Sequence, residues 1–216
     1  NPAFLHALIC YNRALSQRNA LLKYFAANRT FDADTLTLYD DQLCEYAPLI
    51  HEARERFVEA FVPMLKHNYA QIAGDEEDVD LRYRSKLHEM SMRNLLTESL
   101  AKDRLLQYST AGPHREDLLF ELHGRSLRQV GSQGQQKSYL VALKLATFDS
   151  LTENLGAKPI LLLDDVFDKL DADRVEGLIR LVNDDHFGQI FLSDTHRDRT
   201  ELLLQAVDAQ AKVFEL

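Results

Sequence analysis

The sequence predicts an α/β protein, with a helical first part followed by a part that carries a mostly parallel sheet. Over most of the first part, apolar side chains recur at the three- and four-residue spacing of amphipathic helices. Beyond Gly112, short apolar runs alternate with helical segments, which is typical of parallel sheets whose strands are joined by helices. We therefore predict two domains, a helical one at residues 1–106 and an α/β one at residues 107–216.

The helical domain is predicted to contain long, charged helices that pack through one apolar face. Pro48 is expected to separate two of them, because proline lacks the backbone N–H that a helix interior needs. In chain order, the predicted elements are helices at residues 4–25, 36–46 and 50–69, an acidic loop at 74–80, a strand at 81–87 and a helix at 91–106.

The α/β domain is predicted to alternate strands and helices after an initial short strand and turn. Its strands are short and apolar, as expected for strands covered on both faces. The predicted strands lie at residues 118–122, 159–163, 189–192 and, at an edge, 211–216; the predicted helices lie at 138–151, 174–182 and 201–207, with a turn at 123–125 and a loop at 131–134.

The composition limits the kinds of protein to which the chain can belong. With 45% hydrophobic and 27% charged residues, it is that of an ordinary soluble globular protein, and no apolar run is long enough to cross a membrane. The net charge of −9 excludes a polycation that coats DNA through charge alone, so DNA binding would need a local basic patch. Cys10 and Cys44 are expected to be reduced thiols in a cytoplasmic protein, and the histidines show no zinc-ligand spacing.

An apolar strand ending in two acids is the strongest single motif. Residues 160–163 are Ile-Leu-Leu-Leu, and Asp164 and Asp165 follow directly. Such a strand delivers carboxylates to the sheet edge where α/β proteins bind ligands, and carboxylate oxygens suit Mg²⁺. Taken alone, the pattern fits equally well a core strand that runs into an acidic turn.

A small polar loop precedes the longest helix of the second domain. Residues 131–137 read Gly-Ser-Gln-Gly-Gln-Gln-Lys. Ser132 and Gly134 would present a hydroxyl and backbone N–H groups to an anion at the start of the helix. Taken alone, the pattern fits more simply a loop in which Ser132 caps the helix.

The order of these motifs resembles that of ABC-type ATPases. The loop resembles their signature motif, the strand with Asp164 and Asp165 resembles their Walker B motif, and residues 168–171 resemble their D-loop. Residues 193–196 resemble the switch region, with His196 one residue later than the usual histidine. The expected fold is therefore a helical arm domain joined to the C-terminal lobe of an ABC-type P-loop ATPase head.

Within that class, the chain resembles the RecF family of DNA-repair ATPases. The Gly-Pro-His-Arg element and the Ser-Gln-Gly-Gln-Gln form of the signature are specific to RecF-like proteins, and the Asp-Asp ending of Walker B also looks like RecF. The passages that carry the resemblance are residues 11–15, 17–19, 112–118, 131–137 and 163–167.

This resemblance implies a role for each motif residue in the intact protein. Asp164 would support Mg²⁺ and Asp165 would position or activate water. Two heads would sandwich ATP, so that the signature of one head completes the site of the other. The implied signature residues are Ser132, Gln133, Gly134 and Gln135, the D-loop residues Asp168 and Asp171, and the switch residues Thr195 and His196.

The resemblance also implies partners and a biological setting. ATP and Mg²⁺ would drive homodimerisation on gapped DNA, and a RecR-like protein would help to load the recombinase during recombinational repair, replication and the SOS response. Arg13, Arg18 and Lys23 are DNA-contact candidates on the first predicted helix, and Arg82, Arg84 and Lys86 form a second candidate patch. Each patch fits more simply a set of solvated charges paired with nearby acids.

Some features depart from the family pattern. Asp168 and Lys169 replace the usual Ser-Glu of the D-loop, and Lys137 stands where arginine is more frequent. No G-x-x-x-x-G-K-[ST] phosphate loop occurs in the sequence, so we expect a fragment that begins inside the arm and binds no ATP usefully by itself. Another SMC-like ATPase of DNA maintenance and a non-catalytic binding module that keeps the ABC fold are the alternatives.

Overall fold

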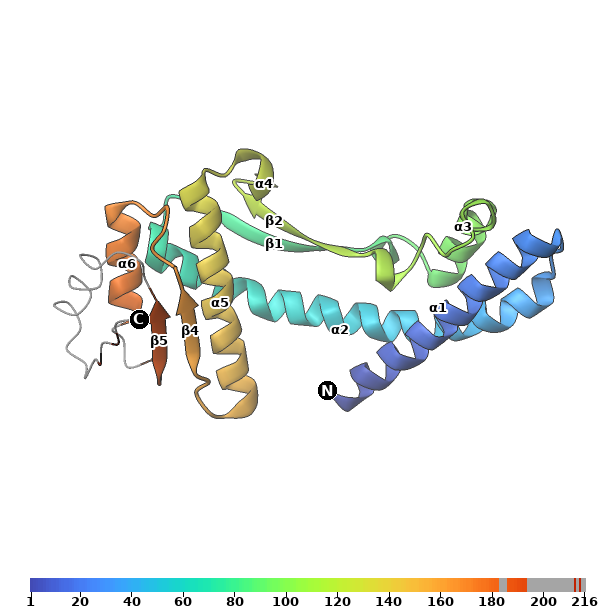
Figure 1. The fold of residues 1–216 in the computed structure, drawn as a ribbon, viewed down its shortest axis with the longest axis horizontal. Helices are drawn as coiled ribbons and strands as arrows, with labels where there is room; N and C mark the ends of the chain where they lie inside the picture. Colours follow the sequence, from blue (N-terminus) through green and yellow to red (C-terminus); the bar gives the residue numbers. More distant parts are fainter. Residues whose placement is uncertain (183–185, 194–211, 213, 215–216) are drawn as a thin grey trace. The chain divides into compact units, whose positions relative to one another are not determined.

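The computed structural model describes residues 1–182, 186–193, 212 and 214. Helices occupy most of the described chain, together with five strands (Figure 1). In chain order the elements are α1 (Pro2–Asn28), α2 (Ala33–Ala73), β1 (Val79–Arg84), the 3-10 helix η1 (Lys86–His88), α3 (Met92–Leu106), the 3-10 helix η2 (Pro113–Arg115), β2 (Asp117–Leu122), β3 (Arg125–Ser126), α4 (Leu127–Val130), α5 (Gln133–Leu155), β4 (Leu161–Asp164), α6 (Ala172–Val182) and β5 (Ile190–Ser193).

The chain divides into two compact units, and both are discontinuous in sequence. One, which we call the arm unit, comprises residues 1–58 and 82–119; the other, the lobe unit, comprises residues 59–81 and 120–216. The predicted division into a helical domain at residues 1–106 and an α/β domain at residues 107–216 stays a prediction. Helices of the described part of the chain are either too short or too polar to span a lipid bilayer.

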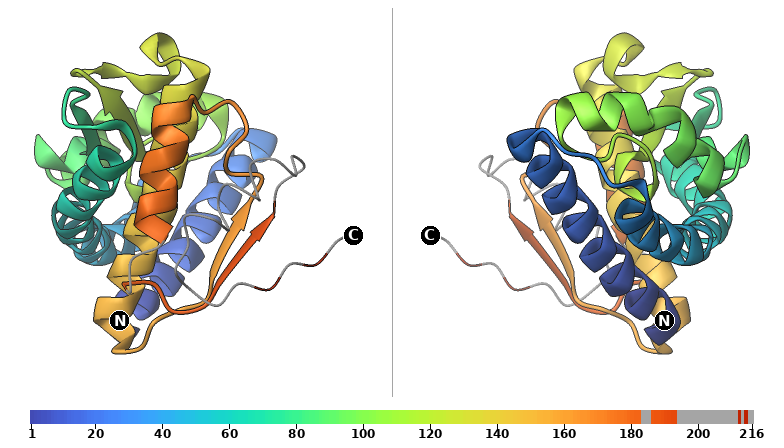
Figure 2. Two further views of the ribbon diagram at one scale, coloured as in Figure 1. Left: turned by 90° about the vertical axis from the view of Figure 1, so that its left-hand side faces the viewer. Right: turned by 90° about the vertical axis from the view of Figure 1, so that its right-hand side faces the viewer.

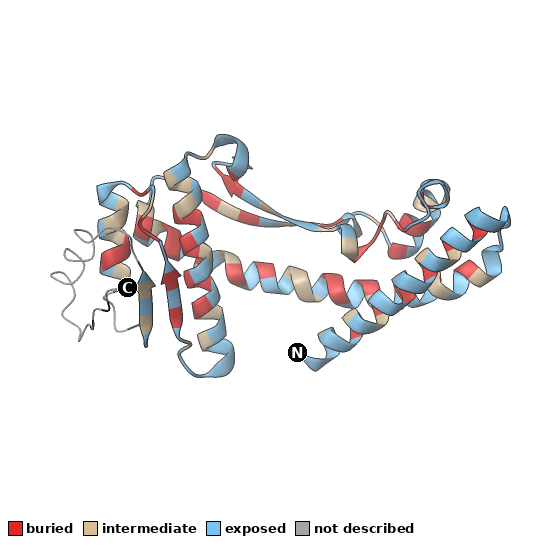
Figure 3. Cartoon of the chain, viewed as in Figure 1, coloured by how far each residue is buried: buried red, intermediate tan, exposed pale blue. Residues whose placement is uncertain are grey.

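Helix α2 is a single helix of 41 residues, so the predicted break at Pro48 is wrong. The side chains next to the proline explain why the helix continues. Leu43, Ala47 and Ile50 are fully buried in the core of the arm unit, against α1 and α3 residues such as Tyr11 and Met92. Burial of this face outweighs the loss of one backbone hydrogen bond. The burial pattern appears as stripes along the helix in Figure 3.

Arg18 is a structural residue of the arm unit, and the prediction that it contacts DNA is wrong. Its side chain is fully buried, whereas a phosphate contact needs an exposed cation. The guanidinium donates to Asp40 (2.6 Å), to Asp103 (2.7 Å) and to the hydroxyl of Ser109 (2.8 Å). Because two carboxylates compensate its charge, the buried cation is tolerated and joins α1, α2 and the segment after α3.

Two of the passages that carry the family resemblance meet inside the arm unit. The Tyr11 hydroxyl lies 2.8 Å from His114 Nδ1, and Asn19 accepts a hydrogen bond from the backbone N–H of Ser109 at 2.7 Å. Gly112 completes the contact with a φ of 119°, and a Cβ there would lie 2.4 Å from the Tyr11 hydroxyl oxygen. The Gly-Pro-His-Arg element therefore anchors α1 in this structure.

His114 is held as a neutral imidazole. Its Nε2 lies 3.0 Å from the Ser109 carbonyl oxygen, which can only accept, so Nδ1 accepts from Tyr11. Burial lowers the pKa of His114, and Arg115 and Arg18 lower it further, while Asp103 and the bond to Ser109 act in the opposite direction.

We expect stability to fall when the pH drops below the ordinary histidine pKa of about 6.5, because the unfolded chain then binds a proton that the folded chain resists. The contribution of neutral His114 to the free energy of unfolding is fully present above that pH, and it is lost as the pH falls towards the depressed pKa of His114 in the folded chain. The slope for this one group is at most about 1.4 kcal/mol per pH unit. Urea unfolding of wild type and His114→Gln at about pH 7.5 and about pH 5.5, roughly one unit on either side of the ordinary pKa, measures this pH dependence. Equal pH dependence of the two proteins would contradict the assignment.

The strands form two separate sheets, and only one is parallel. Strands β1, β2 and β3 make a sheet in which β2 and β3 are an antiparallel hairpin, joined by His123 and Gly124 as predicted for the turn. Strands β4 and β5 are parallel, with Leu161 opposite Ile190 and Asp164 opposite Ser193. In Figure 2, α5 and α6 lie to one side of β4 and β5. The parallel prediction therefore holds for the sheet that carries the two acids.

Candidate functional site

The two acids lie at the carboxyl end of β4, beside the end of β5. The hydroxyl of Ser193 donates to the Asp164 carboxylate, and the backbone N–H of Asp165 lies 3.2 Å from the Ser193 carbonyl oxygen. Asp165 has a left-handed backbone, with φ of 47°, which turns the chain out of the strand. Both carboxylates are exposed and supply oxygen donors, the ligand type that Mg²⁺ prefers.

The predicted signature loop forms the start of α5. Ser132 is the N-cap, and its hydroxyl accepts from the backbone N–H of Gln135 at 3.2 Å. The Gln135 side chain reaches back to the backbone N–H of Ser132 at 2.9 Å, which completes a capping box. The simple capping interpretation and the anion-binding one are compatible, because capping leaves the first N–H groups of the helix directed outwards.

The signature loop and the turn after β4 are in direct contact. Lys137 Nζ donates to the carbonyl oxygen of Asp165 at 2.8 Å. A Cβ on Gly134 would lie 3.2 Å from the carbonyl oxygen of Lys169, in the predicted D-loop. Glycine at 134 therefore lets two of the family motifs approach closely within one chain.

A half-buried polar network around Glu77 fixes the start of α5 to the start of α6. The carboxylate of Glu77 accepts from Gln135 Nε2 at 2.9 Å, from Arg174 at 2.7 Å and from the hydroxyl of Tyr69. Arg174 also donates to the Ser138 hydroxyl at 3.0 Å. We call Tyr69, Glu77, Gln135 and Arg174 the Glu77 network.

Charge and hydrogen bonds hold Glu77 ionised. Burial raises the pKa of its carboxyl, but the hydrogen bonds from Tyr69, Gln135 and Arg174 outweigh burial, so the pKa lies below its ordinary value. Burial and the bond to Glu77 raise the pKa of Tyr69, which remains a phenol and a donor. The network is therefore an ionised acid surrounded by donors at neutral pH.

Asp171 caps α6 and is tied to the same network. Its carboxylate accepts from the backbone N–H of Arg174 at 2.9 Å and from Arg174 Nε at 3.2 Å. Asp168 lies on the turn between β4 and α6 and is half-buried. The predicted D-loop residues thus lie between the predicted Walker B strand and α6, and Arg174 connects α6 to the predicted signature loop.

The structure gathers the predicted signature, Walker B and D-loop residues in the lobe unit. Thr195 and His196, predicted for the switch region, lie outside the described residues, as do the predicted element at 201–207 and, apart from residues 212 and 214, the one at 211–216. Ser193, the last residue of β5, is described and contacts Asp164.

The remaining DNA-contact candidates lie on the arm unit and are exposed. Arg13 and Lys23 are exposed on α1. Arg84 is exposed and pairs with Asp117 at 3.4 Å. With Lys86 and Arg115 it lines a cavity of about 460 Å³ next to Gly112.

Sequence reasoning missed Tyr69, Glu77 and Arg174. Glu77 is one of several acids in a loop that is polar throughout, so nothing in the pattern separates it from its solvated neighbours. Tyr69 follows helical spacing like any core residue, and Arg174 occupies an ordinary helix start. Only the folded chain reveals that the three meet.

Comparison with known proteins identifies relatives over the whole chain. No protein-family model matches it. "DNA replication and repair protein RecF" of Flavobacterium johnsoniae is 49% identical over 216 residues, which are 100% of this chain and 60% of that protein. The protein of the same name from Parabacteroides distasonis is 44% identical over 99% of this chain and 57% of its own length.

Solved structures agree with these sequence relatives. A structure described as the recombination mediator protein RecF-ATP in the RecFOR pathway matches with a TM-score of 0.77 and 29% identity, over 92% of this chain and 54% of that one. A second structure, described as RecF-ATPrS, gives a TM-score of 0.76. The chain spans less than two thirds of the length of the curated relatives it matches. Over its whole length, the chain is therefore similar to part of the RecF DNA replication and repair proteins.

Proposed function

We propose that the chain supplies the signature, Walker B and D-loop part of a DNA-repair ATPase that acts in recombinational repair and replication. The contact between Gly134 and the Lys169 carbonyl oxygen carries this proposal, since it places the capped start of α5 beside the turn that holds the acids. The relatives are RecF proteins, and one of the matching structures is described as RecF-ATP.

In the intact protein, Asp164 would hold Mg²⁺ and Asp165 would position or activate the attacking water. The exposed carboxylates, with the Ser193 hydroxyl on Asp164, support this assignment because they form a set of hard oxygen donors at one sheet edge. The phosphate loop would come from residues of the full-length protein outside these 216. We therefore expect no useful ATP affinity in this chain alone.

The signature residues would complete the site of a second head. Ser132 and Gln133 are exposed at the start of α5, where the helix dipole and free N–H groups favour a phosphate. Gln135 lies behind them, since its side chain is occupied by the capping box and Glu77. Asp168 and Asp171 would lie near the seam of the ATP-dependent dimer, and Thr195 and His196 would form the switch.

One face of the small parallel sheet of β4 and β5 is apolar and exposed, which supports the proposal that further residues of the head pack on it. Leu161 and Leu163 are buried, whereas Ile160, Leu162 and Phe191 are 59%, 63% and 51% exposed. Parallel sheets are normally covered on both faces. Residues of the full-length protein outside these 216 would pack on this apolar face.

The full-length protein would bind DNA at junctions of single- and double-stranded segments. It would act in the cytoplasm. The exposed Arg13 and Lys23 on α1, and Arg84, Lys86 and Arg115 around the cavity, support phosphate contacts despite the net charge of −9. A RecR-like protein would be the partner, and loading of the recombinase would be the outcome, in keeping with the RecFOR pathway named for the matching structures.

The full-length protein is expected to double its mass on gapped DNA when Mg-ATP is added. Ser132→Arg should abolish that doubling, because a bulky cation would occupy the start of α5 where the opposing phosphate is expected. Static light scattering with and without Mg-ATP measures both results. Loss of the cap costs about 1 kcal/mol, so circular dichroism must show that the variant is folded.

Thr147→Arg is the matched control, because it adds the same charge at an exposed position of α5 away from the cap. It should dimerise like the wild type. If the mass of the wild type does not change on addition of Mg-ATP, or if Ser132→Arg dimerises normally, the proposal of ATP-dependent dimerisation fails. A non-catalytic binding module then becomes the better interpretation.

A further inference from the structure

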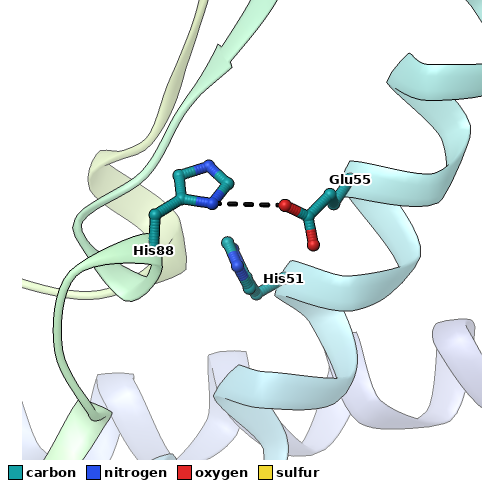
Figure 4. Close-up of side chains that lie close together, drawn as sticks. All are labelled: His51, Glu55 and His88. Atoms are coloured by element: carbon teal, nitrogen blue, oxygen red, sulfur yellow. Dashed lines mark ion pairs between the residues drawn. The ribbon is translucent and has the colours of Figure 1, made fainter.

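We propose that His51, Glu55 and His88 form a binding site for a transition-metal ion of the Zn²⁺ type in the arm unit. His51 and Glu55 are four residues apart on α2 and therefore share one face of the helix, and His88 ends η1. One ligand atom from each residue lies within 4.8 Å of the other two. Figure 4 shows the three side chains directed towards one another.

The hydrogen bonds of His88 leave one ring nitrogen free to face the cluster. His88 Nε2 lies 3.2 Å from the carbonyl oxygen of Tyr83, which can only accept, so this nitrogen carries a proton. In a neutral ring, Nδ1 then has a lone pair, and it lies 3.2 Å from the Glu55 carboxylate. A lone pair facing a carboxylate is repulsive, and either a proton or a metal cation on Nδ1 makes the contact attractive.

The same bond to Tyr83 is the outer-shell contact that metal-binding histidines usually make. A ligating histidine donates its other N–H to a carbonyl or carboxylate, which fixes the ring and its tautomer. His51 differs from His88, because its Nδ1 is buried, has no hydrogen-bond partner among the described residues and lies 3.9 Å from the Glu116 carboxylate, which is too far for a hydrogen bond. That carboxylate is itself held by Arg54 and Ser85.

The donor set selects the class of ion. Two imidazoles and one carboxylate suit Zn²⁺ and similar ions, whereas Mg²⁺ prefers oxygen ligands throughout. Around tetrahedral Zn²⁺ the ligand atoms lie roughly 3.4 Å apart, given bond lengths of about 2.1 Å. The ligand atoms now lie within 4.8 Å of one another and must come closer to reach that separation. Glu55 and His88 are partly exposed and their side chains can rotate inwards, while His51 is buried and fixed. The fourth position would be open to water or to a partner's side chain.

An ion at this site would join α2 to η1 within the arm unit. The expected effect is a rise in the unfolding temperature with zinc concentration, because the ion binds the folded chain in preference to the unfolded one. The spacing of the histidines predicted no zinc site. The third ligand comes from a different element, so it adds no spacing signal to His51 and Glu55.

Calorimetric titration of the chelator-treated full chain with Zn²⁺ tests the proposal, with visible absorption of Co²⁺ as a second readout. We expect one ion per chain. His88→Gln and Glu55→Gln should each weaken binding by more than the roughly 10- to 100-fold that loss of an outer-shell partner costs. The zinc-dependent rise in unfolding temperature should disappear in both variants, and an equal concentration of Mg²⁺ should not compete.

His67→Gln is the matched control, because His67 is an exposed histidine on the same helix and lies outside the cluster. It should bind like the wild type. Absence of stoichiometric binding by the wild type, or unchanged affinity in His88→Gln, overturns the proposal. Loss of binding in His6→Gln alone would also overturn it, since His6 and Cys10 lie 3.6 Å apart and would then hold the ion.

Discussion

Replacing Arg18 with alanine is expected to lower the free energy of unfolding by about 3–5 kcal/mol, the usual cost of removing one partner from a buried ion pair. Arg18 and Asp103 are both fully buried, and the variant leaves the Asp103 carboxylate without its cation. The hydroxyls of Ser99 and Thr110 still donate to Asp103, but neither supplies a positive charge. Urea unfolding followed by circular dichroism measures the loss.

Arg13→Ala is the control for this experiment. It removes the same kind of side chain from the same helix at an exposed position, so the free energy of unfolding should change by no more than about 0.5 kcal/mol. A loss of less than about 1 kcal/mol in Arg18→Ala would contradict the structural role of the buried arginine. If Arg13→Ala weakened DNA binding by the full-length protein without loss of stability, it would support a DNA contact at that position.

Gly112→Ala is expected to be similarly destabilising, for two reasons that add. A side chain at a φ of 119° costs about 1–3 kcal/mol in backbone strain. The new Cβ would also lie 2.4 Å from the Tyr11 hydroxyl oxygen and 2.8 Å from Met92 Cε, and such overpacking costs about 1–3 kcal/mol more. Met92 can turn away, but Tyr11 is buried and held by His114. Thermal and urea unfolding measure the combined effect.

Gly124→Ala separates the two contributions. Gly124 also has a positive φ, of 68°, but a Cβ there meets nothing within 4 Å. Its replacement should cost only the backbone strain, about 1–2 kcal/mol. If the Gly112 and Gly124 variants lose equal stability, the close approach of Tyr11 to Gly112 contributes nothing.

Local patterns in the sequence predicted most elements of the fold, because helical spacing and short apolar runs report burial of one face directly. Helix α3 and strand β2, for example, lie within about one residue of their predicted positions. The prediction failed at Pro48, where a local rule for proline competes with burial of Leu43, Ala47 and Ile50 against residues far away in sequence. Such long-range packing leaves no signal in a local window.

The candidate site shows the same division between local and long-range information. Ser132, Gly134, Asp164 and Asp165 were predicted because each belongs to a short contiguous motif, and their roles remain proposals. The predicted exposure of Arg18 was wrong because its spacing on α1 is that of a surface cation, while its partners Asp40 and Asp103 come from other elements. Glu77 could not be predicted for a similar reason, since its partners come from three separate helices.

The Glu77 network has a consequence for how sequences of this kind can diverge. The Glu77 carboxylate accepts from one side chain each of α2, α5 and α6, and a change of Glu77 to glutamine or alanine would leave only the exposed Asp171 carboxylate as counter-charge for Arg174. We therefore expect substitutions at position 77 to persist only where position 174 has changed as well, and substitutions at position 174 only where position 77 has changed. Across related sequences, positions 69, 77, 135 and 174 should covary as a group, so that inheritance preserves the link between the two helices even where the residues that form it differ.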